Sequence, residues 1–171
     1  TSDKLLNRIS YVNGDFGIGT APESWARNNF AVYGTDNIRG VVWRWSMDGL
    51  TILSILYKIN SFATVQLPLR TGNSKIYGVF NAQTNRYEFA MESAGESPAF
   101  TMAFSEPDNA FEGERSYQPE YMACLGTLLI TYKGGTPYTH DSVLFNTFYG
   151  VEYDSSITPV FNDQPLIKKT F

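Results

Sequence analysis

From Val41 onward the chain is a series of short runs rich in β-branched and aromatic residues, and turn residues separate these runs. Such side chains pack well on a pleated sheet, whereas glycine, proline, asparagine and aspartate favour chain reversals, so the pattern predicts an all-β sandwich or barrel. Strands are expected at residues 40–46, 50–59, 62–69, 75–81, 86–92, 98–104, 123–133 and 142–153, with weaker candidates at 30–34 and 157–161. About eight to ten strands is the size expected of a jelly roll.

The chain has 171 residues, which is the length of about one domain. We therefore expect a single domain over 1–171, in which 1–38 form a less regular N-terminal segment. Aromatic residues make up 15% of the chain and charged residues 18%, a balance that favours an ordered globular body over a disordered tail.

Turn signals indicate that several strands are antiparallel neighbours. Asp48-Gly49 lies between "VVWRWS" and "LTILSILYK", Gly134-Gly135 follows "LLITYK", and Thr71-Gly72-Asn73 separates two further runs. Glycine, asparagine and aspartate tolerate positive φ, so each of these sites can form a tight reversal.

Alternation along the predicted strands assigns their faces. In 143–153 five apolar and aromatic side chains fall on one side, which predicts that this side closes the core, while Leu144 and Phe148 fall on the other. The five side chains are Val143, Phe145, Tyr149, Val151 and Tyr153. The strand predicted at 50–59 is apolar on both faces, so it requires cover on both faces. The cover comes either from neighbouring chains or from a loop or the N-terminal segment.

Net charge and cysteine content exclude several classes of protein. The formal net charge is −4 and the basic residues are scattered, so no basic patch for phosphates is expected. Cys124 is the single cysteine, which excludes an internal disulfide and a thiolate metal cluster. No apolar run approaches the length of a membrane-spanning helix, and the N-terminus lacks the pattern of a signal peptide, so we expect a soluble protein without membrane insertion.

The sequence "THDS" places the single histidine, His140, beside Asp141 and Ser142. Consecutive residues of a strand point to opposite faces, so these three side chains cannot orient one another as a catalytic relay. No Gly-X-Ser-X-Gly motif supplies a nucleophile elsewhere, although His140 with a distant serine and aspartate stays a minor alternative. We predict a turn that leads into the last strand.

Other catalytic, metal and cofactor patterns are also weak. The acidic residues of 106–114 are not spaced as an EF-hand, and the glycines of 14–19 do not fit a dinucleotide fingerprint. Calcium on the acidic loop and a pair of glycosidase carboxylates stay as minor alternatives. The sequence therefore predicts no catalytic residue, no metal site and no cofactor, and the protein is not expected to be an enzyme.

Tryptophans suggest a different function. Trp25, Trp43 and Trp45 could form a stacking platform for sugars, as in carbohydrate-binding β-sandwiches, and Trp43 and Trp45 share a strand face. The competing interpretation is that these rings belong to the core.

The last third of the chain combines several features in a fixed order. A strand at 100–104 ends near Pro107, an irregular loop covers 105–121, "GTLLI" begins the next strand at Gly126, and a final strand runs into Asp154 before a proline-aromatic close at 159–161. This order resembles the end of picorna-like virus capsid domains, and 128–161 is most similar to the tail of the small coat protein of comoviruses and related plant viruses. The upstream stretch "RGVVWRWSMDGLTILSILYK" is similar to an early strand of the same domains.

The resemblance implies an eight-stranded antiparallel jelly-roll β-sandwich of two facing four-stranded sheets. It also implies a structural capsid protein, cleaved from a polyprotein, that assembles in the host cytoplasm with itself and other coat subunits into an icosahedral virion around an RNA genome. Because the chain lacks a basic arm, RNA contact would be weak or indirect. A host receptor is a further expected partner. The alternatives are a carbohydrate-binding β-sandwich module and a protruding receptor-binding domain of a viral shell.

A long loop in a compact domain often makes contacts with a partner. We therefore predict that three aromatic residues of the loop at 105–121 anchor the assembly interface: Phe111, Tyr117 and Tyr121.

Overall fold

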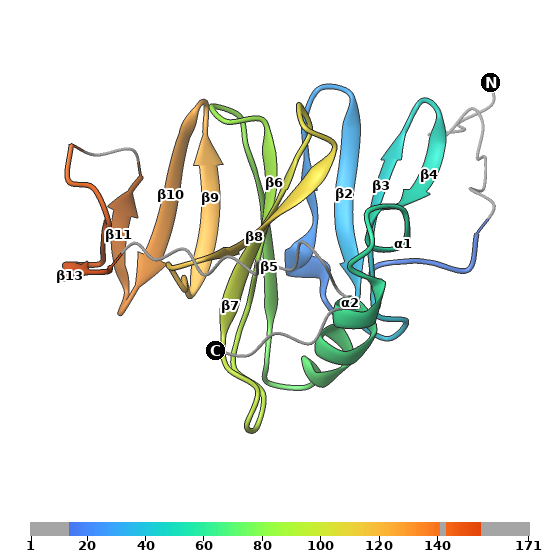
Figure 1. Cartoon of the computed structure of the whole chain (residues 1–171), viewed down its shortest axis with the longest axis horizontal. Helices are drawn as coiled ribbons and strands as arrows, with labels where there is room; N and C mark the ends of the chain where they lie inside the picture. The colour runs from blue at the N-terminus through green and yellow to red at the C-terminus, as the bar shows by residue number, and fades with distance from the viewer. Residues whose placement is uncertain (1–13, 141–142, 155–171) are drawn as a thin grey trace, which may run out of the picture.

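The structure, a computed structural model, describes residues 14–140 and 143–154. Its described residues form antiparallel sheets with a few short helices, none of the sheets closes into a barrel, and the all-β prediction is confirmed. We call β1–β4 the first sheet, β5–β8 the central sheet and β9–β11 the third sheet (Figure 1). The strands of the first and central sheets are β1 (Ala26–Arg27), β2 (Ala31–Asp36), β3 (Val41–Ser46), β4 (Gly49–Ile52), β5 (Ile76–Asn81), β6 (Arg86–Met91), β7 (Phe100–Ser105) and β8 (Ala110–Arg115). The remaining strands are β9 (Tyr121–Leu125), β10 (Leu128–Lys133), β11 (Thr136–Thr139), β12 (Thr147–Phe148) and β13 (Val151–Glu152), of which the last two form a hairpin.

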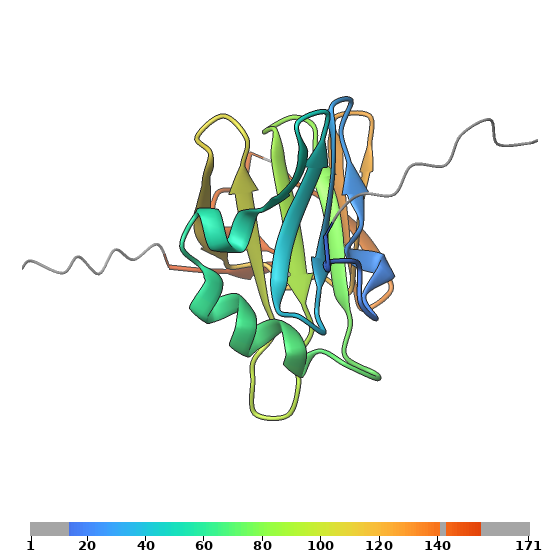
Figure 2. The same ribbon diagram turned by 90° about the vertical axis from the view of Figure 1, so that its right-hand side faces the viewer.

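The central sheet is covered on both faces. On one face, Tyr33 of β2 stacks on Phe80 of β5 and Tyr87 of β6, with ring centroids 5.4 and 5.1 Å apart. On the other face, Val79 packs in a smaller cluster with Met122 and Leu129 of the third sheet. The three sheets therefore lie face to face as layers, as the two views in Figures 1 and 2 show.

Strands that neighbour one another in each sheet are consecutive in the chain. A jelly roll instead places strands from distant parts of the chain side by side. The eight-stranded jelly roll in two sheets is therefore not confirmed, and in the described residues each sheet is an up-and-down meander.

Successive sheets meet at their first strands. The strand β1 contacts β5, and β5 contacts β9. A short 3-10 helix, η1 (Pro22–Ser24), precedes β1 and also packs on β5. The first and third sheets are thus both joined to the central sheet through β5.

Five predicted strands are confirmed within a residue or two: β2, β3, β5, β6 and β7. The turn at Gly134-Gly135 is also confirmed, because Lys133 pairs with Thr136 and both glycines have positive φ. The turn predicted at Asp48-Gly49 lies one residue earlier, since Ser46 pairs with Gly49.

The strands predicted at 50–59 and 62–69 are largely wrong. After β4 the chain forms α1 (Leu53–Leu56), α2 (Asn60–Gln66) and the 3-10 helix η2 (Leu67–Leu69). Ala63 and Leu67 are buried while Thr64 and Val65 are exposed, which is the spacing of a helix packed on one side. These helices span from the first sheet to the central sheet, and Phe62 of α2 packs edge-on against Phe100 of β7.

Three predictions in the second half of the chain are also corrected. The expected loop at 105–121 contains β8, and the strand expected at 123–133 is the hairpin of β9 and β10, which turns at Gly126. The described part of 142–153 forms the β12–β13 hairpin rather than one strand. Val143 and Phe145 are 89% and 87% exposed, so they do not close the core. The strand predicted at 157–161 and most of the N-terminal start lie outside the described residues.

Arg70 joins the helical connection to the central sheet. Its side chain is buried, its Nε donates to the carbonyl of Glu92 at 3.1 Å, and its Nη2 donates to the carbonyl of Pro98 at 2.8 Å. Its Nη1 donates to the backbone carbonyl and the side-chain oxygen of Gln66 at 2.8 and 2.7 Å. Burial lowers the pKa of Arg70, and these neutral oxygens, with the ring of Phe100 at 5.3 Å, surround the charge.

The contact between η1 and β5 generates a prediction about stability. A Cβ added at Gly78 would lie 1.9 Å from the carbonyl oxygen of Ser24, which also accepts a 2.7 Å hydrogen bond from Tyr87. We expect Gly78→Ala to lower the free energy of unfolding by about 2 kcal/mol or more, because the first and central sheets must move apart. Urea unfolding followed by circular dichroism measures this change.

Gly17→Ala is the matched control, because Gly17 has no atom within 4 Å of an added Cβ and no positive φ. We expect this variant to change the free energy of unfolding by less than about 0.5 kcal/mol. Equal losses in the two variants would contradict a specific role for the contact between η1 and β5.

Candidate functional site

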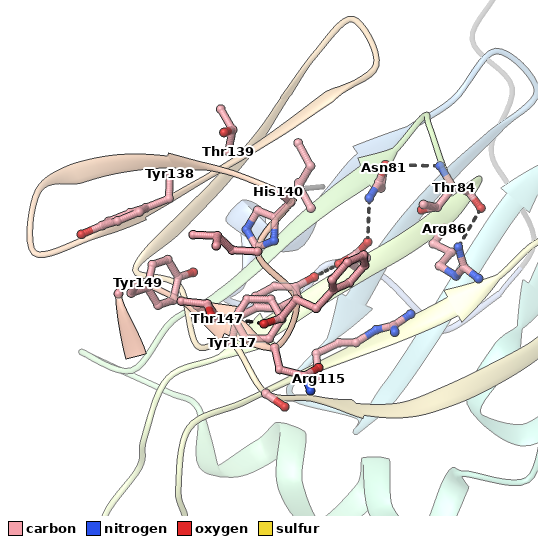
Figure 3. A pocket seen from close by; sticks show the side chains of 18 of the residues that line it. Asn81, Thr84, Arg86, Arg115, Tyr117, Tyr138, Thr139, His140, Thr147 and Tyr149 are labelled. Atoms are coloured by element: carbon pink, nitrogen blue, oxygen red, sulfur yellow. Dashed lines mark hydrogen bonds between the residues drawn. The ribbon is translucent and has the colours of Figure 1, made fainter. Parts of the chain in front are cut away.

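A pocket of about 860 Å³ lies between the central sheet and the third sheet (Figure 3). Its walls come from the β5–β6 hairpin, the end of β8 and the residues after it, β11, and the segment 144–150. The third sheet is held against the central sheet at β5 and β9, where Tyr77 and Tyr121 make an edge-on ring contact at 5.8 Å. The pocket lies on the opposite side of the third sheet from this contact, toward β6 and β8. Tyr117 and Leu129 of the smaller apolar cluster line it.

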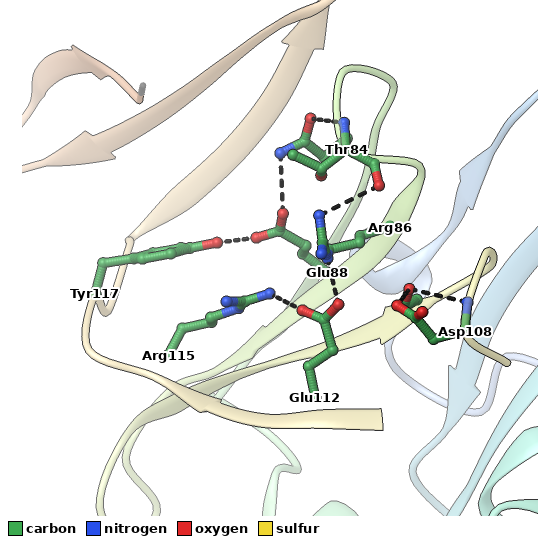
Figure 4. A network of polar contacts seen from close by, with 9 residues as sticks. Thr84, Arg86, Glu88, Asp108, Glu112, Arg115 and Tyr117 are labelled. Atoms are coloured by element: carbon green, nitrogen blue, oxygen red, sulfur yellow. Dashed lines mark hydrogen bonds and ion pairs between the residues drawn. The ribbon is translucent and has the colours of Figure 1, made fainter. Parts of the chain in front are cut away.

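Glu88 forms the buried polar wall of the pocket. It lies on β6, and it points to the same face as Asn81 of β5. Its Oε1 accepts a 3.0 Å hydrogen bond from Nδ2 of Asn81, and its Oε2 accepts a hydrogen bond from the hydroxyl of Tyr117 (Figure 4). Burial raises the pKa of the Glu88 carboxyl, which favours its neutral form at the pocket wall.

Two arginines and one carboxylate form an ion-pair cluster beside Glu88 (Figure 4). Nε of Arg86 lies 2.6 Å from Oε1 of Glu112, and Arg115 pairs with the second oxygen of the same carboxylate. Nη1 of Arg86 also donates to the carbonyl of Thr84 at 3.3 Å. The carboxylate of Glu112 therefore holds both guanidinium groups near the pocket.

Aromatic rings form the opposite part of the pocket. Tyr117 lies 4.6 Å from the ring of His140 and 5.4 Å from that of Phe148, while Tyr138 and Tyr149 meet edge-on at 5.0 Å. The chain thus brings rings from three separate segments to one cavity whose other side is polar (Figure 3).

His140 is a structural member of this aromatic group. Its backbone N–H donates to the carbonyl of Leu129, so it extends the pairing at the end of β11 rather than beginning a final strand. Its Nε2 lies 2.8 Å from the hydroxyl of Thr131. Asp141 and Ser142 lie outside the described residues, so the predicted geometry of the "THDS" sequence stays a prediction.

The three predicted interface residues lie in different environments. Phe111 packs edge-on against Phe104 at 5.2 Å, and Tyr117 is buried at the pocket. Tyr121 is 51% exposed on β9. Their role in assembly stays a prediction, and the ring of Tyr121 contacts those of Tyr77 and Tyr132.

Tryptophans predicted as a sugar platform are separated by their burial. Trp43 is buried over Gly34, and its Nε1 donates to the carbonyl of Gly17 at 2.6 Å. Trp45 and Trp25 are 45% and 47% exposed. Trp43 therefore serves as packing, and a platform of all three rings is not present.

The acidic residues of 106–114 are dispersed among separate contacts. Glu106 pairs with Arg44 at 2.9 Å, Asp108 accepts a hydrogen bond from Ser105 at 2.6 Å, and Glu112 pairs with the two arginines. In the part of the chain that the structure describes, no group of three His, Cys, Asp or Glu residues lies close enough to hold a metal ion.

Sequence reasoning missed the polar wall of the pocket. Its signal was present, because Asn81, Arg86 and Glu88 are polar residues at alternating positions of two otherwise apolar strands. Arg115 and Tyr117 lay in a region that was predicted to be a loop. The pocket could not be found without knowing that β8 and the third sheet flank the central sheet.

Comparisons with known proteins give no family for this chain: no family model matches it, and no curated protein matches it. Among the described residues, no helix is both long enough and apolar enough to cross a membrane.

The raised pKa of Glu88 predicts a pH dependence of stability. The unfolded chain releases this proton at an ordinary carboxyl pKa, whereas the folded chain retains it to higher pH. The contribution of Glu88 to the free energy of unfolding therefore falls as pH rises above about 4.5. We expect Glu88→Gln to remove this fall, so that the variant gains stability relative to the wild type as pH rises above about 4.5.

Urea midpoints at several pH values measure the difference between the two proteins. Glu96→Gln, at an exposed position, controls for the loss of one carboxylate. Parallel pH profiles of the wild type and Glu88→Gln would contradict the predicted proton retention.

Proposed function

We propose that the chain is a structural capsid subunit, which assembles with copies of itself and with other coat subunits into an icosahedral shell around an RNA genome. The observation that carries this proposal is that the two end sheets have apolar outer faces that the described residues leave partly uncovered. Contiguous exposed apolar side chains can mark an interaction surface.

The outer face of the third sheet is the better exposed of the two. Cross-strand pairs place Leu125 beside Leu128 and Tyr121 beside Tyr132 on this face, and Leu125 and Leu128 are 73% and 39% exposed. The opposite face of the same sheet buries Met122 and Leu129 against the central sheet. The inner face of the third sheet thus belongs to the core, whereas its outer face is apolar but is not covered by the core.

The outer face of the first sheet has the same character. Val32, Trp45 and Leu50 lie side by side across β2, β3 and β4, and Trp45 is 45% exposed. The segment before β1 covers part of this face, because the carbonyl of Gly17 accepts a hydrogen bond from Trp43. Trp45 extends beyond this cover and stays 45% exposed.

Contact between the outer face of the third sheet of one subunit and the outer face of the first sheet of the next would be head-to-tail. Such a contact closes into a ring when its rotation allows, and shells are built from rings. Burying a leucine side chain contributes roughly 1.5 to 3 kcal/mol, so several such residues support a specific interface. Tyr121, one of the predicted anchors, borders this surface, because it is 51% exposed while its ring also contacts Tyr77 of the central sheet.

The remaining expectations of the capsid interpretation form part of the same proposal. They are cleavage from a polyprotein, assembly in the host cytoplasm, residence in the virion, and recognition of a host receptor. The net charge of −4 favours weak or indirect contact with RNA. The jelly-roll order of strands in two four-stranded sheets also belongs to this proposal. Assembly itself depends on the exposed apolar faces rather than on that strand order.

Assembly is tested by placing charge on the outer face of the third sheet. We expect the wild-type chain to form oligomers in sedimentation velocity experiments, with rings or shells visible by electron microscopy. In the double variant Leu125→Glu and Leu128→Glu, the association constant should fall at least tenfold, because the variant places unpaired carboxylates in the contact.

Ile38→Glu is the control, since Ile38 is 60% exposed in the turn between β2 and β3 and lies outside both faces. It should assemble like the wild type, and all three proteins should keep the same circular dichroism spectrum. A wild-type chain that stays monomeric at every concentration, or a double variant that assembles normally, would reject assembly through this face.

A further inference from the structure

The pocket beside Glu88 has the size of a small-molecule site, and like many such sites it has one polar side and one aromatic side. Its volume of about 860 Å³ lies within the range of roughly 300 to 1,000 Å³ that ligand sites occupy. One side has the amide of Asn81, the carboxyl of Glu88 and the guanidinium of Arg115, and the other side has the rings of Tyr138 and Tyr149. A ligand that fits both sides must combine many hydrogen-bonding groups with apolar faces.

Pyranose sugars have this combination, because hydroxyl groups surround a ring whose faces are formed by C–H groups. Aromatic side chains contact those faces, and planar amide, carboxyl and guanidinium groups bond pairs of adjacent hydroxyls. Tyr138 is only partly buried, so its ring is accessible to a ligand. The guanidinium groups of Arg86 and Arg115 each have more N–H groups than the hydrogen bonds they make with protein.

Charge at the pocket favours a neutral ligand over an anion. Glu112 pairs with both arginines, and Glu114 also lines the pocket. Two acidic side chains thus offset the two guanidinium groups, while the buried Glu88 keeps its carboxyl at the wall through hydrogen bonds from Asn81 and Tyr117. Phosphate or sulfate would have to approach these carboxylates, whereas a sugar hydroxyl can donate to them.

Preorganisation also supports binding. Asn81 accepts the backbone N–H groups of Gln83 and Thr84 through Oδ1, which fixes the direction of its amide. Tyr117 is held at its backbone, since its carbonyl accepts a 2.7 Å hydrogen bond from Thr101. Groups that are already fixed lose little conformational entropy when a ligand binds.

We propose that this pocket binds a neutral saccharide, with Tyr138 contacting the ring face of a sugar and Asn81, Glu88 and Arg115 bonding its hydroxyls. The site is separate from the apolar outer faces of the first and third sheets, so sugar binding and assembly can succeed or fail independently. It also differs from the tryptophan platform that the sequence suggested, because none of the three tryptophans lines the pocket.

The test uses neutral hexasaccharides of glucose, galactose, mannose and N-acetylglucosamine, titrated into the ¹⁵N-labelled chain and followed by amide chemical shifts. At least one of these sugars should shift the amides of pocket residues, with a dissociation constant below about 1 mM. Tyr138→Ala should weaken binding at least tenfold, and Tyr138→Phe should retain it because the ring remains.

Trp45→Ala is the matched control, since it removes an exposed ring from the outer face of the first sheet. It should bind like the wild type. Three results would overturn the proposal: no pocket amide shifts with any of the sugars, Trp45→Ala abolishes binding while Tyr138→Ala does not, or inorganic phosphate binds the pocket more tightly than every sugar. The first and third of these results are measured on the wild type alone, from its amide chemical shifts, so they can be obtained even if a Tyr138 variant is unstable.

Discussion

The requirement to cover both faces of the central sheet determines how the rest of the described chain is arranged. The face toward the first sheet is a continuous aromatic layer, in which Tyr33 stacks on Phe80 and Tyr87. The face toward the third sheet begins with Val79 and Ala90 and becomes polar at Asn81 and Glu88. The first sheet and the helical connection together cover the apolar face, where Phe62 packs on Phe100, whereas the third sheet leaves a pocket where the polar residues of the other face begin.

Strands with clear alternation could be predicted from the sequence, and segments whose structure depends on distant partners could not. The runs that became β3, β5 and β6 have turn residues at both ends, so local signals were sufficient. In 53–69 the β-branched and aromatic residues favoured strands, but burial of Ala63 and Leu67 on one side stabilises helices. The strand β8 carries charged residues such as Glu112 and Arg115, and it becomes a strand by pairing with β7.

The candidate site was less predictable than the fold. Tyr117 was predicted as an interface anchor on a loop. It does lie in the connection between β8 and β9, but its side chain is buried and its hydroxyl donates to Glu88. Glu88 itself was hidden within a strand that was predicted well, because strand prediction says nothing about which layer covers a given face. The segment 50–59 was predicted to require cover on both faces, but in the structure it is the central sheet that has apolar clusters on both faces.

Arg70 has a consequence for which changes of length the chain tolerates. Its guanidinium bonds to Gln66, four residues earlier, and to the carbonyls of Glu92 and Pro98 on the far side of a chain reversal. An insertion between Gln66 and Arg70 would shift the guanidinium away from these oxygens and leave its charge buried without acceptors. Lys58, by contrast, lies at an exposed junction between α1 and α2 with positive φ. The chain can therefore change length at this junction, whereas the stretch from 66 to 70 must keep its length and its arginine.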